Sequence, residues 1–247
     1  MIPPIIHQTG PADKKYWHPI WLEGNKIWDK LYPNHLHYTW TDEQIDRLIE
    51  YNYPQYWNKY INLPYHALRI DISRLFILHC YGGIYADLDY LPCMNFAHEL
   101  YGDFVAVGAL TDDEVVQNSL MASSVLNDDV LVLIDKLFEQ YYSKPIVSNS
   151  NITEWNDYIR DTFGPTGISR NLDVFGNKLQ ILESKLYNPD FLDHDDNIRG
   201  KHMLTGIWGD DVITNYDTVE EFMSNILQWY KDSRHLDYTH HKPGDSL

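Results

Sequence analysis

Hydrophobic spacing predicts a buried helix in the first third of the chain. Between residues 67 and 81, apolar side chains recur on one helical face and again on the opposite face. The first face carries Leu68, Ile72, Leu75, Phe76 and His79, and the second carries Ile70 and Ile77. A helix that is apolar on two sides is normally buried on both. Asp71 and Arg74 stand three residues apart within it and therefore share one edge.

A glycine turn and a short strand follow this helix. The Gly-Gly pair at residues 82–83 ends it, because glycine tolerates the left-handed conformation of a helix cap. Residues 84–89 then alternate as a strand. Alternation places Tyr85, Asp87 and Asp89 on one face of that strand.

Two carboxylates at a strand end suggest a metal site. Hard cations such as Mg²⁺ and Mn²⁺ take oxygen ligands, and Mg²⁺ is often held by one or two carboxylates with water and substrate phosphate. Such a metal neutralises a leaving diphosphate as a Lewis acid. For the Asp-X-Asp pair alone, a solvated acidic turn is an equally good interpretation. The neighbouring helix with Asp71 and Arg74, the glycine pair and Tyr85 favour the metal site.

These residues resemble a known signature. Ala67-Leu-Arg-Ile-Asp71-Ile-Ser-Arg74 and Tyr81-Gly-Gly-Ile-Tyr85-Ala-Asp87-Leu-Asp89 are similar to the motif of the family-32 glycosyltransferases, sugar transferases with a DXD motif. The catalytic domains of the clostridial glucosylating toxins have a similar core. The spacing also matches, with sixteen residues from Asp71 to Asp87 and thirteen from Arg74 to Asp87.

The resemblance implies a GT-A fold, a nucleotide-diphosphate sugar donor, Mn²⁺ or Mg²⁺, and retention of anomeric configuration. It implies that Asp89 is the main metal ligand. Asp87 would reach the ribose and sugar of the donor and also touch the metal. Asp71 and Arg74 would hold the donor sugar, and Tyr85 would lie in the donor site.

The first strand is predicted at residues 4–8 and resembles the opening strand of the family, where the base of the nucleotide docks. His7 and Gln8 are therefore candidate donor contacts. The alternative for His7 is a core histidine satisfied by backbone groups. Relatives place a Trp shortly after the His, whereas this chain has Thr-Gly, so Tyr16, Trp17 or a later aromatic residue would have to replace it. The identity of the nucleotide base of the donor therefore stays open.

Two later segments resemble the family around the reacting sugar. Asn118 is the candidate for a contact to the β-face of the anomeric carbon, and a turn asparagine is the alternative. Gly164 and Pro165 stand where the family carries Thr-Gly-Pro near donor and acceptor. This chain has Phe163 in place of that Thr.

A histidine near the C-terminus is expected to complete the metal site. Family members show His, then Gly four residues later, then Ser-Trp. His202 fits this spacing, with Ile207 in place of the Ser. His240 and its neighbour His241 lie at the extreme end, and His240 fits the spacing without the Trp. His202 is preferred because it follows the segment around residue 187 that resembles a family Tyr-Pro.

The remaining pattern predicts an α/β layered domain. Helices are expected at residues 17–32, 41–52, 128–142, 155–163 and 219–234, and strands at 36–40, 104–108 and 179–182. Residues 53–62 are interpreted as an aromatic linker. Without an internal repeat or clear boundary, we expect one GT-A domain over residues 1–247 with a mixed central sheet and a C-terminal helical extension from about 210.

The amino-acid composition limits the classes of partner that the protein is expected to bind. The formal net charge of −17 argues against nucleic acid, whose binding needs clustered Lys and Arg. No run reaches the roughly 18 apolar residues of a transmembrane helix, and the N-terminus does not resemble a signal peptide. We therefore expect a cytoplasmic or membrane-peripheral protein without an integral membrane segment. Cys80 and Cys93 are interpreted as free thiols, with a bridge conceivable if the protein is exported.

The resulting hypothesis is metal-dependent, retaining transfer of a hexose from a UDP- or GDP-sugar to a hydroxyl of a glycan or glycolipid. One alternative is a metal-dependent phosphohydrolase, although Leu91 stands where those enzymes usually carry Thr. The other is a nucleotide-sugar binding module without turnover.

Overall fold

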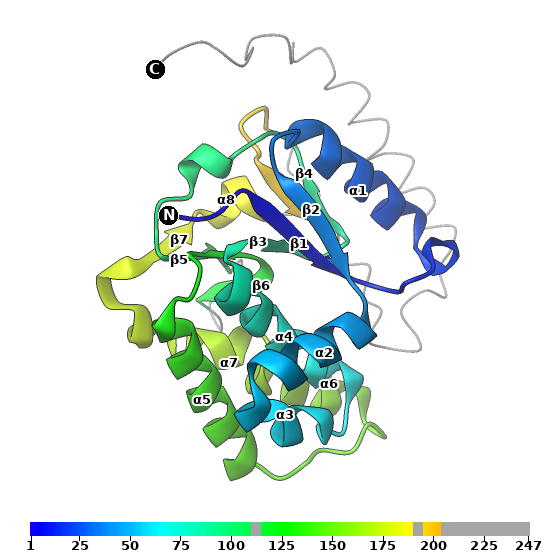
Figure 1. The fold of residues 1–247 in the computed structure, drawn as a ribbon, viewed down its shortest axis with the longest axis vertical. Helices are drawn as coiled ribbons and strands as arrows, with labels where there is room; N and C mark the ends of the chain where they lie inside the picture. Colours follow the sequence, from blue (N-terminus) through cyan, green and yellow to red (C-terminus); the bar gives the residue numbers. More distant parts are fainter. Residues whose placement is uncertain (110–114, 190–194, 204–247) are drawn as a thin grey trace. The chain divides into compact units, whose positions relative to one another are not determined.

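Six strands form one mixed sheet in the computed structural model, in the order β2-β1-β3-β6-β5-β7 (Figure 1). Residues 1–109, 115–189 and 195–203 are described. The sheet strands are β1 (Ile5–Thr9), β2 (Leu36–Trp40), β3 (Gly83–Ala86), β5 (Phe104–Gly108), β6 (Val116–Ser123) and β7 (Leu179–Leu182). A second, two-stranded sheet pairs β4 (Tyr90–Pro92) with β8 (Gly200–His202).

The longer helices are α1 (Pro19–Leu31), α2 (Asp42–Asn52), α3 (Pro54–Ile61), α4 (His66–Tyr81), α5 (Asp128–Ser143) and α6 (Ile152–Thr162). Shorter ones are α7 (Pro165–Ser169) and α8 (Ser184–Tyr187), with 3₁₀ segments at Lys14–Tyr16, Ala97–Glu99 and Leu172–Lys178. No helix among the described residues is long and apolar enough to cross a membrane.

The sheet is parallel on both sides, where β2, β1 and β3 pair and where β5 and β7 pair, and only β6 in the middle runs antiparallel to its neighbours. Strand β1 runs parallel to both β2 and β3, whereas β6 runs antiparallel to β3 and β5. The carboxyl ends of β1, β2 and β3 therefore meet at one edge, which is where ligands bind in open α/β sheets. The α/β class with a mixed sheet flanked by helices is confirmed.

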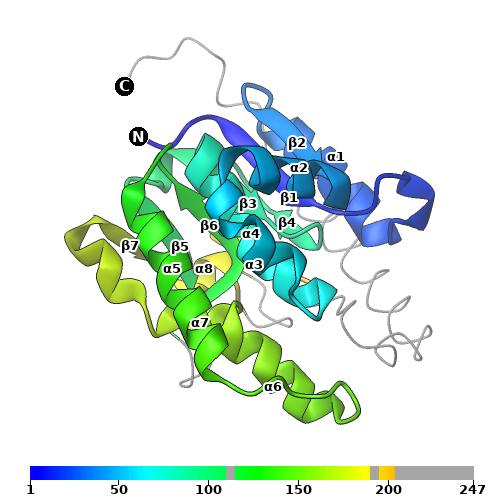
Figure 2. The same ribbon diagram turned by 60° about the horizontal axis from the view of Figure 1, so that its bottom comes forward.

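Alternating strand residues feed two hydrophobic clusters on opposite faces of the sheet. Tyr85, Phe104 and Met121 pack with residues of α2 to α6, and Ile84 and Val105 pack with residues of α1 and β4. Figures 1 and 2 show this division, with α2, α3, α5 and α6 gathered on one side of the sheet and α1 beside β4 on the other.

Helix α4 is buried along most of its length, as its two apolar faces predict. Its C-cap Gly82 has φ of 61° and Gly83 has φ of 90°, so both glycines adopt the left-handed region that the sequence indicates. A Cβ on Gly83 would also come within 2.5 Å of the Ile5 carbonyl oxygen. The glycine pair therefore joins the helix to β3 through close contact with the first strand.

Two sequence predictions need correction, and three others concern residues outside the described part of the chain. The strand predicted at residues 84–89 ends at Ala86, because the chain turns before β4 begins at Tyr90. The supposed linker at residues 53–62 contains helix α3, whose Tyr56 and Tyr60 pack into the core. The helix expected at 219–234, the extension from about 210 and His240/His241 lie outside the described residues.

Candidate functional site

The site is built on the turn between β3 and β4. The Asp87 N–H donates to the Ser119 carbonyl at 2.9 Å, and the Tyr90 N–H donates to the Asp87 carbonyl at 2.9 Å. From the other side, the Met203 N–H donates to the Asp89 carbonyl at 2.9 Å. These bonds fix the backbone of the turn, so both carboxylates project from a defined position at the carboxyl end of β3.

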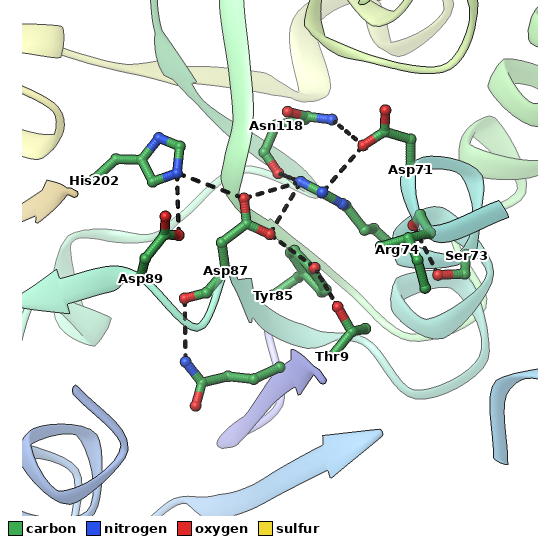
Figure 3. A network of polar contacts seen from close by, with 11 residues as sticks. Thr9, Asp71, Ser73, Arg74, Tyr85, Asp87, Asp89, Asn118 and His202 are labelled. Atoms are coloured by element: carbon green, nitrogen blue, oxygen red, sulfur yellow. Dashed lines mark hydrogen bonds and ion pairs between the residues drawn. The ribbon is translucent and has the colours of Figure 1, made fainter. Parts of the chain in front are cut away.

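Strand β8 brings His202 to this turn. Because β8 pairs antiparallel with β4, His202 stands opposite Tyr90. Its Nε2 lies 3.2 Å from Asp89 Oδ1 and 3.8 Å from Asp87 Oδ2 (Figure 3). One ligand atom from each of Asp87, Asp89 and His202 can be chosen so that all three lie within 4.8 Å of one another. The three residues predicted to bind metal therefore come together, and their role as ligands stays a prediction.

The chemistry of these side chains fits a divalent cation. Two carboxylates and an imidazole form a partial ligand set for Mn²⁺ or Mg²⁺, with positions left for water and phosphate. Burial disfavours the charged form of His202, but the carboxylates of Asp89 and Asp87 outweigh it and raise its pKa above the ordinary value. The two neighbouring carboxylates thus favour a positive charge at His202.

Arg74 links the helix to the turn. Its Nη2 lies 3.0 Å from Asp71 Oδ1, and its Nη1 lies 3.1 Å from Asp87 Oδ1. The same Nη1 donates to the Asn118 carbonyl at 2.9 Å (Figure 3). The guanidinium is buried and sits 5.1 Å from the centre of the Tyr85 ring. One buried cation thus holds two carboxylates from different elements.

Burial sets the protonation of these carboxylates. It raises the pKa of Asp71 to about 6, against the opposing effect of Arg74. Burial also raises the pKa of Asp87, again opposed by Arg74. Without Arg74, both carboxylates would lose the charge that offsets their desolvation.

A strand irregularity places Asn118. In the β5–β6 pairing, Ala106 faces Met121 and Val107 faces Gln117, so residues 118–120 have no partner in β5. Such a bulge redirects side chains. The Asn118 Nδ2 donates to Asp71 Oδ1 at 3.1 Å, and the side chain is buried. Asn118 therefore joins Asp71 and Arg74, and its predicted contact to the sugar stays a prediction.

Tyr85 shares a face with Asp87, as the alternation predicts. Its hydroxyl donates to Asp87 Oδ1 at 2.9 Å and lies 3.0 Å from Thr9 Oγ1. The side chain is fully buried. Sequence reasoning missed Thr9, because its approach to Tyr85 depends on the pairing of β1 with β3 rather than on any local pattern.

His7 matches the alternative of a buried histidine satisfied by the protein. The Trp40 indole N–H donates to His7 Nδ1 at 3.1 Å, so Nε2 carries the proton and donates to the Gly82 carbonyl at 2.9 Å. Burial lowers the pKa of His7 to about 4, which keeps the ring neutral. Both ring nitrogens are thus hydrogen-bonded within the protein, and the imidazole links β1 to β2 and to the C-cap of α4.

Gln8 is also fully buried, and its amide donates from Nε2 to the Asp87 carbonyl at 3.2 Å. It therefore touches the turn that carries Asp87 and Asp89 rather than open solvent. Of the two aromatic residues considered for the base, Tyr16 is exposed. Trp17 is buried and donates from Nε1 to the Pro11 carbonyl at 2.7 Å.

Gly164 and Pro165 begin helix α7 and lie against α6. A Cβ on Gly164 would come within 2.8 Å of the Arg160 Cα. Helix α7 meets the sheet at its other end, where Ser169 Oγ accepts from the N–H of Val116 at 3.1 Å. The described contacts do not join Gly164 or Pro165 to the carboxylates, so their part in donor binding stays a prediction.

Part of the chain is similar to known proteins. The model of the glycosyltransferase sugar-binding region containing the DXD motif matches residues 20–105. Inositol phosphoceramide mannosyltransferase 3 of Schizosaccharomyces pombe is 40% identical over 88 residues, which cover 36% of this chain and 24% of that protein. Mannosyl phosphorylinositol ceramide synthase SUR1 of Saccharomyces cerevisiae is 39% identical over 89 residues, 36% of this chain and 23% of that protein.

A longer match is the initiation-specific alpha-1,6-mannosyltransferase of Candida albicans, 30% identical over 136 residues, with 53% of this chain and 31% of that protein covered. The chain spans about a quarter to a third of the length of these curated relatives. Similar solved structures include the PaToxG glycosyltransferase, with TM-score 0.49, 15% identity and 69% of each chain covered. The galactosyltransferase LgtC has TM-score 0.41 and 11% identity, covering 90% of this chain and 95% of its own.

Proposed function

We propose that this chain, whose residues 20–105 carry the sugar-binding region of the DXD-containing glycosyltransferases, moves a hexose from a nucleotide-diphosphate sugar to a hydroxyl of a glycolipid or glycan. One observation carries the proposal. Asp87, Asp89 and His202 gather at the carboxyl end of β3, directly beside the buried ion-pair cluster of Asp71 and Arg74. This juxtaposition supplies a cation site next to groups suited to hold a sugar.

Asp87, Asp89 and His202 are the residues that would hold Mn²⁺ or Mg²⁺. The ion would supply Lewis-acid neutralisation of the leaving diphosphate. An acidic chain needs such local positive charge to accept an anionic donor, and Arg74 adds a second, permanent charge nearby. Preorganised charges of this kind contribute most where charge builds up in the transition state.

Asp71 and Asn118 are proposed to orient the sugar. The Asn118 side chain donates to Asp71, Asp71 is paired with Arg74, and Arg74 donates to the Asn118 backbone carbonyl, so little rotational freedom remains to be lost when the donor binds. Asp87 completes the arrangement, because Arg74 and Tyr85 fix one carboxylate oxygen between them. A hydroxyl-rich ligand would meet acceptors and donors that are held in place beforehand.

The relatives suggest the finer identity of the substrates. Two of the named proteins are mannosyltransferases or synthases of mannosylated inositol phosphoceramide, and a third is an alpha-1,6-mannosyltransferase. We therefore propose mannose as the transferred hexose and the headgroup of an inositol-containing glycolipid as the first acceptor to test. Retention of anomeric configuration is part of the proposal, with the leaving phosphate taking the proton of the acceptor hydroxyl.

Thermal stability in the presence of nucleotide sugars tests the proposal. A ligand at one hundred times its Kd stabilises a protein by about 2.7 kcal/mol, which corresponds to roughly 5–10 °C in Tm for a chain of this size. GDP-mannose, GDP-fucose, UDP-glucose and UDP-galactose would each be tested with and without Mn²⁺. The stabilised mixture would then be incubated with inositol phosphoceramide and analysed by mass spectrometry.

We expect one donor to raise Tm only with Mn²⁺ and to yield a hexosylated lipid. The variant Asp89→Asn is the control, since it should keep the fold and lose the metal-dependent shift. Absence of any donor effect, together with hydrolysis of an aryl phosphate, would favour a phosphohydrolase. Metal-dependent donor binding without transfer or hydrolysis would favour a binding module.

A further inference from the structure

A chain of polar side chains runs from the surface to the metal-binding turn on the α1 side of the sheet. Helix α1 presents Asn25 and Asp29 one turn apart, strand β2 presents His37, and strand β1 presents Gln8. The Gln8 Oε1 lies 2.8 Å from His37 Nε2 and accepts from Asn25 Nδ2 at 3.3 Å. His37 Nδ1 in turn lies 2.7 Å from Asp29 Oδ1.

The contact to Lys14 determines the orientation of the Asn25 and Gln8 side-chain amides. Lys14 Nζ can only donate, and it donates to Asn25 Oδ1 at 3.1 Å. The Asn25 amide nitrogen therefore points toward Gln8, and a donor there requires the oxygen of the Gln8 amide. The Gln8 Nε2 is left to face the other way, where it donates to the Asp87 carbonyl at 3.2 Å.

The same logic applies to His37. Its two ring nitrogens face two acceptors, the Asp29 carboxylate and the Gln8 oxygen. The Gln8 oxygen can only accept, so His37 Nε2 donates to it, and the same Nε2 lies 3.4 Å from Asn25 Nδ2. Because Asp29 is largely exposed and the His37 side chain is buried, the contact ties a surface charge to a buried ring.

Helix α1 also touches the turn directly. A Cβ on Gly24 would lie 2.7 Å from Leu91 Cδ2 and 3.3 Å from the Leu88 carbonyl oxygen. Glycine at this point of the apolar face therefore allows the helix to approach the residue between the two aspartates. The amide chain begins at the adjacent residue, Asn25.

We propose that Gln8 is a positioning residue whose amide, oriented by Asn25 and His37, holds the carbonyl of Asp87 and so fixes the Asp87–Asp89 turn for metal binding. The inference rests on the proposed function only in taking Asp87 and Asp89 as metal ligands. It assigns no donor contact to Gln8. It also gives Asn25, His37 and Asp29 a part in the site although none of them touches the carboxylates.

The variant Asn25→Asp tests the inference through the sign of its effect. It keeps the size of the side chain and the contact to Lys14, but it replaces the N–H that faces Gln8 Oε1 with an acceptor. Repulsion between the new carboxylate and Gln8 Oε1 then opposes the amide orientation in which Gln8 Nε2 donates to the Asp87 carbonyl. By charge alone, an added carboxylate near a cation site would strengthen metal binding.

We expect Asn25→Asp to weaken Mn²⁺ binding by about tenfold, the lower end of the effects seen when residues behind metal ligands are changed. Mn²⁺ affinity would be measured by electron paramagnetic resonance of the free ion, without any sugar nucleotide. Asn58→Asp is the matched control, because Asn58 is exposed on α3 and the variant makes the same change in charge. Asn25→Ala should give a smaller loss, since His37 still holds the Gln8 oxygen.

Equal Mn²⁺ affinity in wild type, Asn25→Asp and Asn58→Asp, or tighter binding by Asn25→Asp, would overturn the inference. So would the failure of the wild-type protein to bind Mn²⁺. Mn²⁺ binding by a wild-type protein without donor turnover would instead refute the proposed transferase function alone. In that case, the comparison of the variants still decides the role of Gln8.

Discussion

The buried cation Arg74 provides the sharpest test of the electrostatics of the site. We consider Arg74→Met, which keeps much of the length of the side chain and removes the charge. The side chain lies 3.0 Å from Asp71 Oδ1 and 3.1 Å from Asp87 Oδ1, with side-chain exposures of 4% for the arginine, 9% for Asp71 and 19% for Asp87. These low values mean that water cannot replace the lost charge.

The expected cost follows from this burial. Removing one partner of a buried, hydrogen-bonded ion pair costs about 3–5 kcal/mol of unfolding free energy, because the remaining charge is left uncompensated. Protonation of Asp71 relieves part of the cost. Its pKa of about 6 already lies above the ordinary value of 3.8, and loss of Arg74 raises it further, since burial then loses its main opposing effect.

The sign of the pH dependence follows. A carboxyl whose pKa is higher in the folded than in the unfolded state disfavours folding increasingly as pH rises from about 4 through the folded-state pKa. The loss in Arg74→Met should therefore be full at pH 8 and smaller by about 1–2 kcal/mol at pH 5.5, at about 1.4 kcal/mol per unit of additional shift. Asp71→Asn should remove much of this pH dependence in the double variant.

Equilibrium urea unfolding of the single and double variants at both pH values measures these quantities. We expect the double-variant cycle to show a coupling of about 1–3 kcal/mol. Arg170→Met is the matched control, because Arg170 is paired with Asp161 at 3.1 Å on an exposed surface and should cost no more than about 1 kcal/mol. Equal losses for Arg74→Met and Arg170→Met, or a loss independent of pH, would refute the reasoning.

Three further predictions concern single residues. Asp89→Asn should abolish sugar transfer and metal-dependent stabilisation while changing the Tm of the metal-free protein little, and full activity would show that the metal assignment is wrong. His202→Ala should raise the Mn²⁺ concentration for half-maximal activity at least tenfold, whereas His66→Ala, at an exposed histidine paired with Asp42, should not. His7→Leu should cost about 1–3 kcal/mol, because two buried hydrogen-bonding groups lose their partner. As pH falls from 6.5 to 4, the wild type should lose stability that the variant does not lose, because His7 takes up its proton in the unfolded state before it does so in the folded state. Identical pH profiles of the two proteins in urea unfolding would contradict this.

Much of the secondary structure follows from local sequence patterns. The buried helix at residues 67–81 is confirmed as α4, and Leu36–Trp40 is confirmed as a strand. Thr41 caps the following helix through a complete capping box with Gln44, as the polar residues at that point indicate. Such features depend on contacts a few residues apart, so a single sequence carries them.

The free thiols at Cys80 and Cys93 are also confirmed. Other local patterns were misleading: the period of two continues through Asp89 although the strand ends at Ala86, because a turn closed by hydrogen bonds to β6 and to residue 203 replaces it. An alternating pattern by itself does not show where a strand stops pairing with its neighbours.

The sequence by itself identified the carboxylates, the arginine and the histidine as candidates, through the Asp-X-Asp pair and through the resemblance of the surrounding residues to a family motif. Only the tertiary structure decided which atoms meet. The antiparallel pairing of β8 with β4 brings His202 to Asp89, and the bulge in β6 turns Asn118 toward Asp71. Strand alternation in β1 sends His7 to the α2–α4 face and Gln8 to the α1 face, so His7 bonds to Trp40 and Gln8 bonds to the turn that carries Asp87 and Asp89. The reason is physical: local propensity acts over a few residues, whereas these contacts join segments far apart in the chain and exist only once sheet register and helix packing are set.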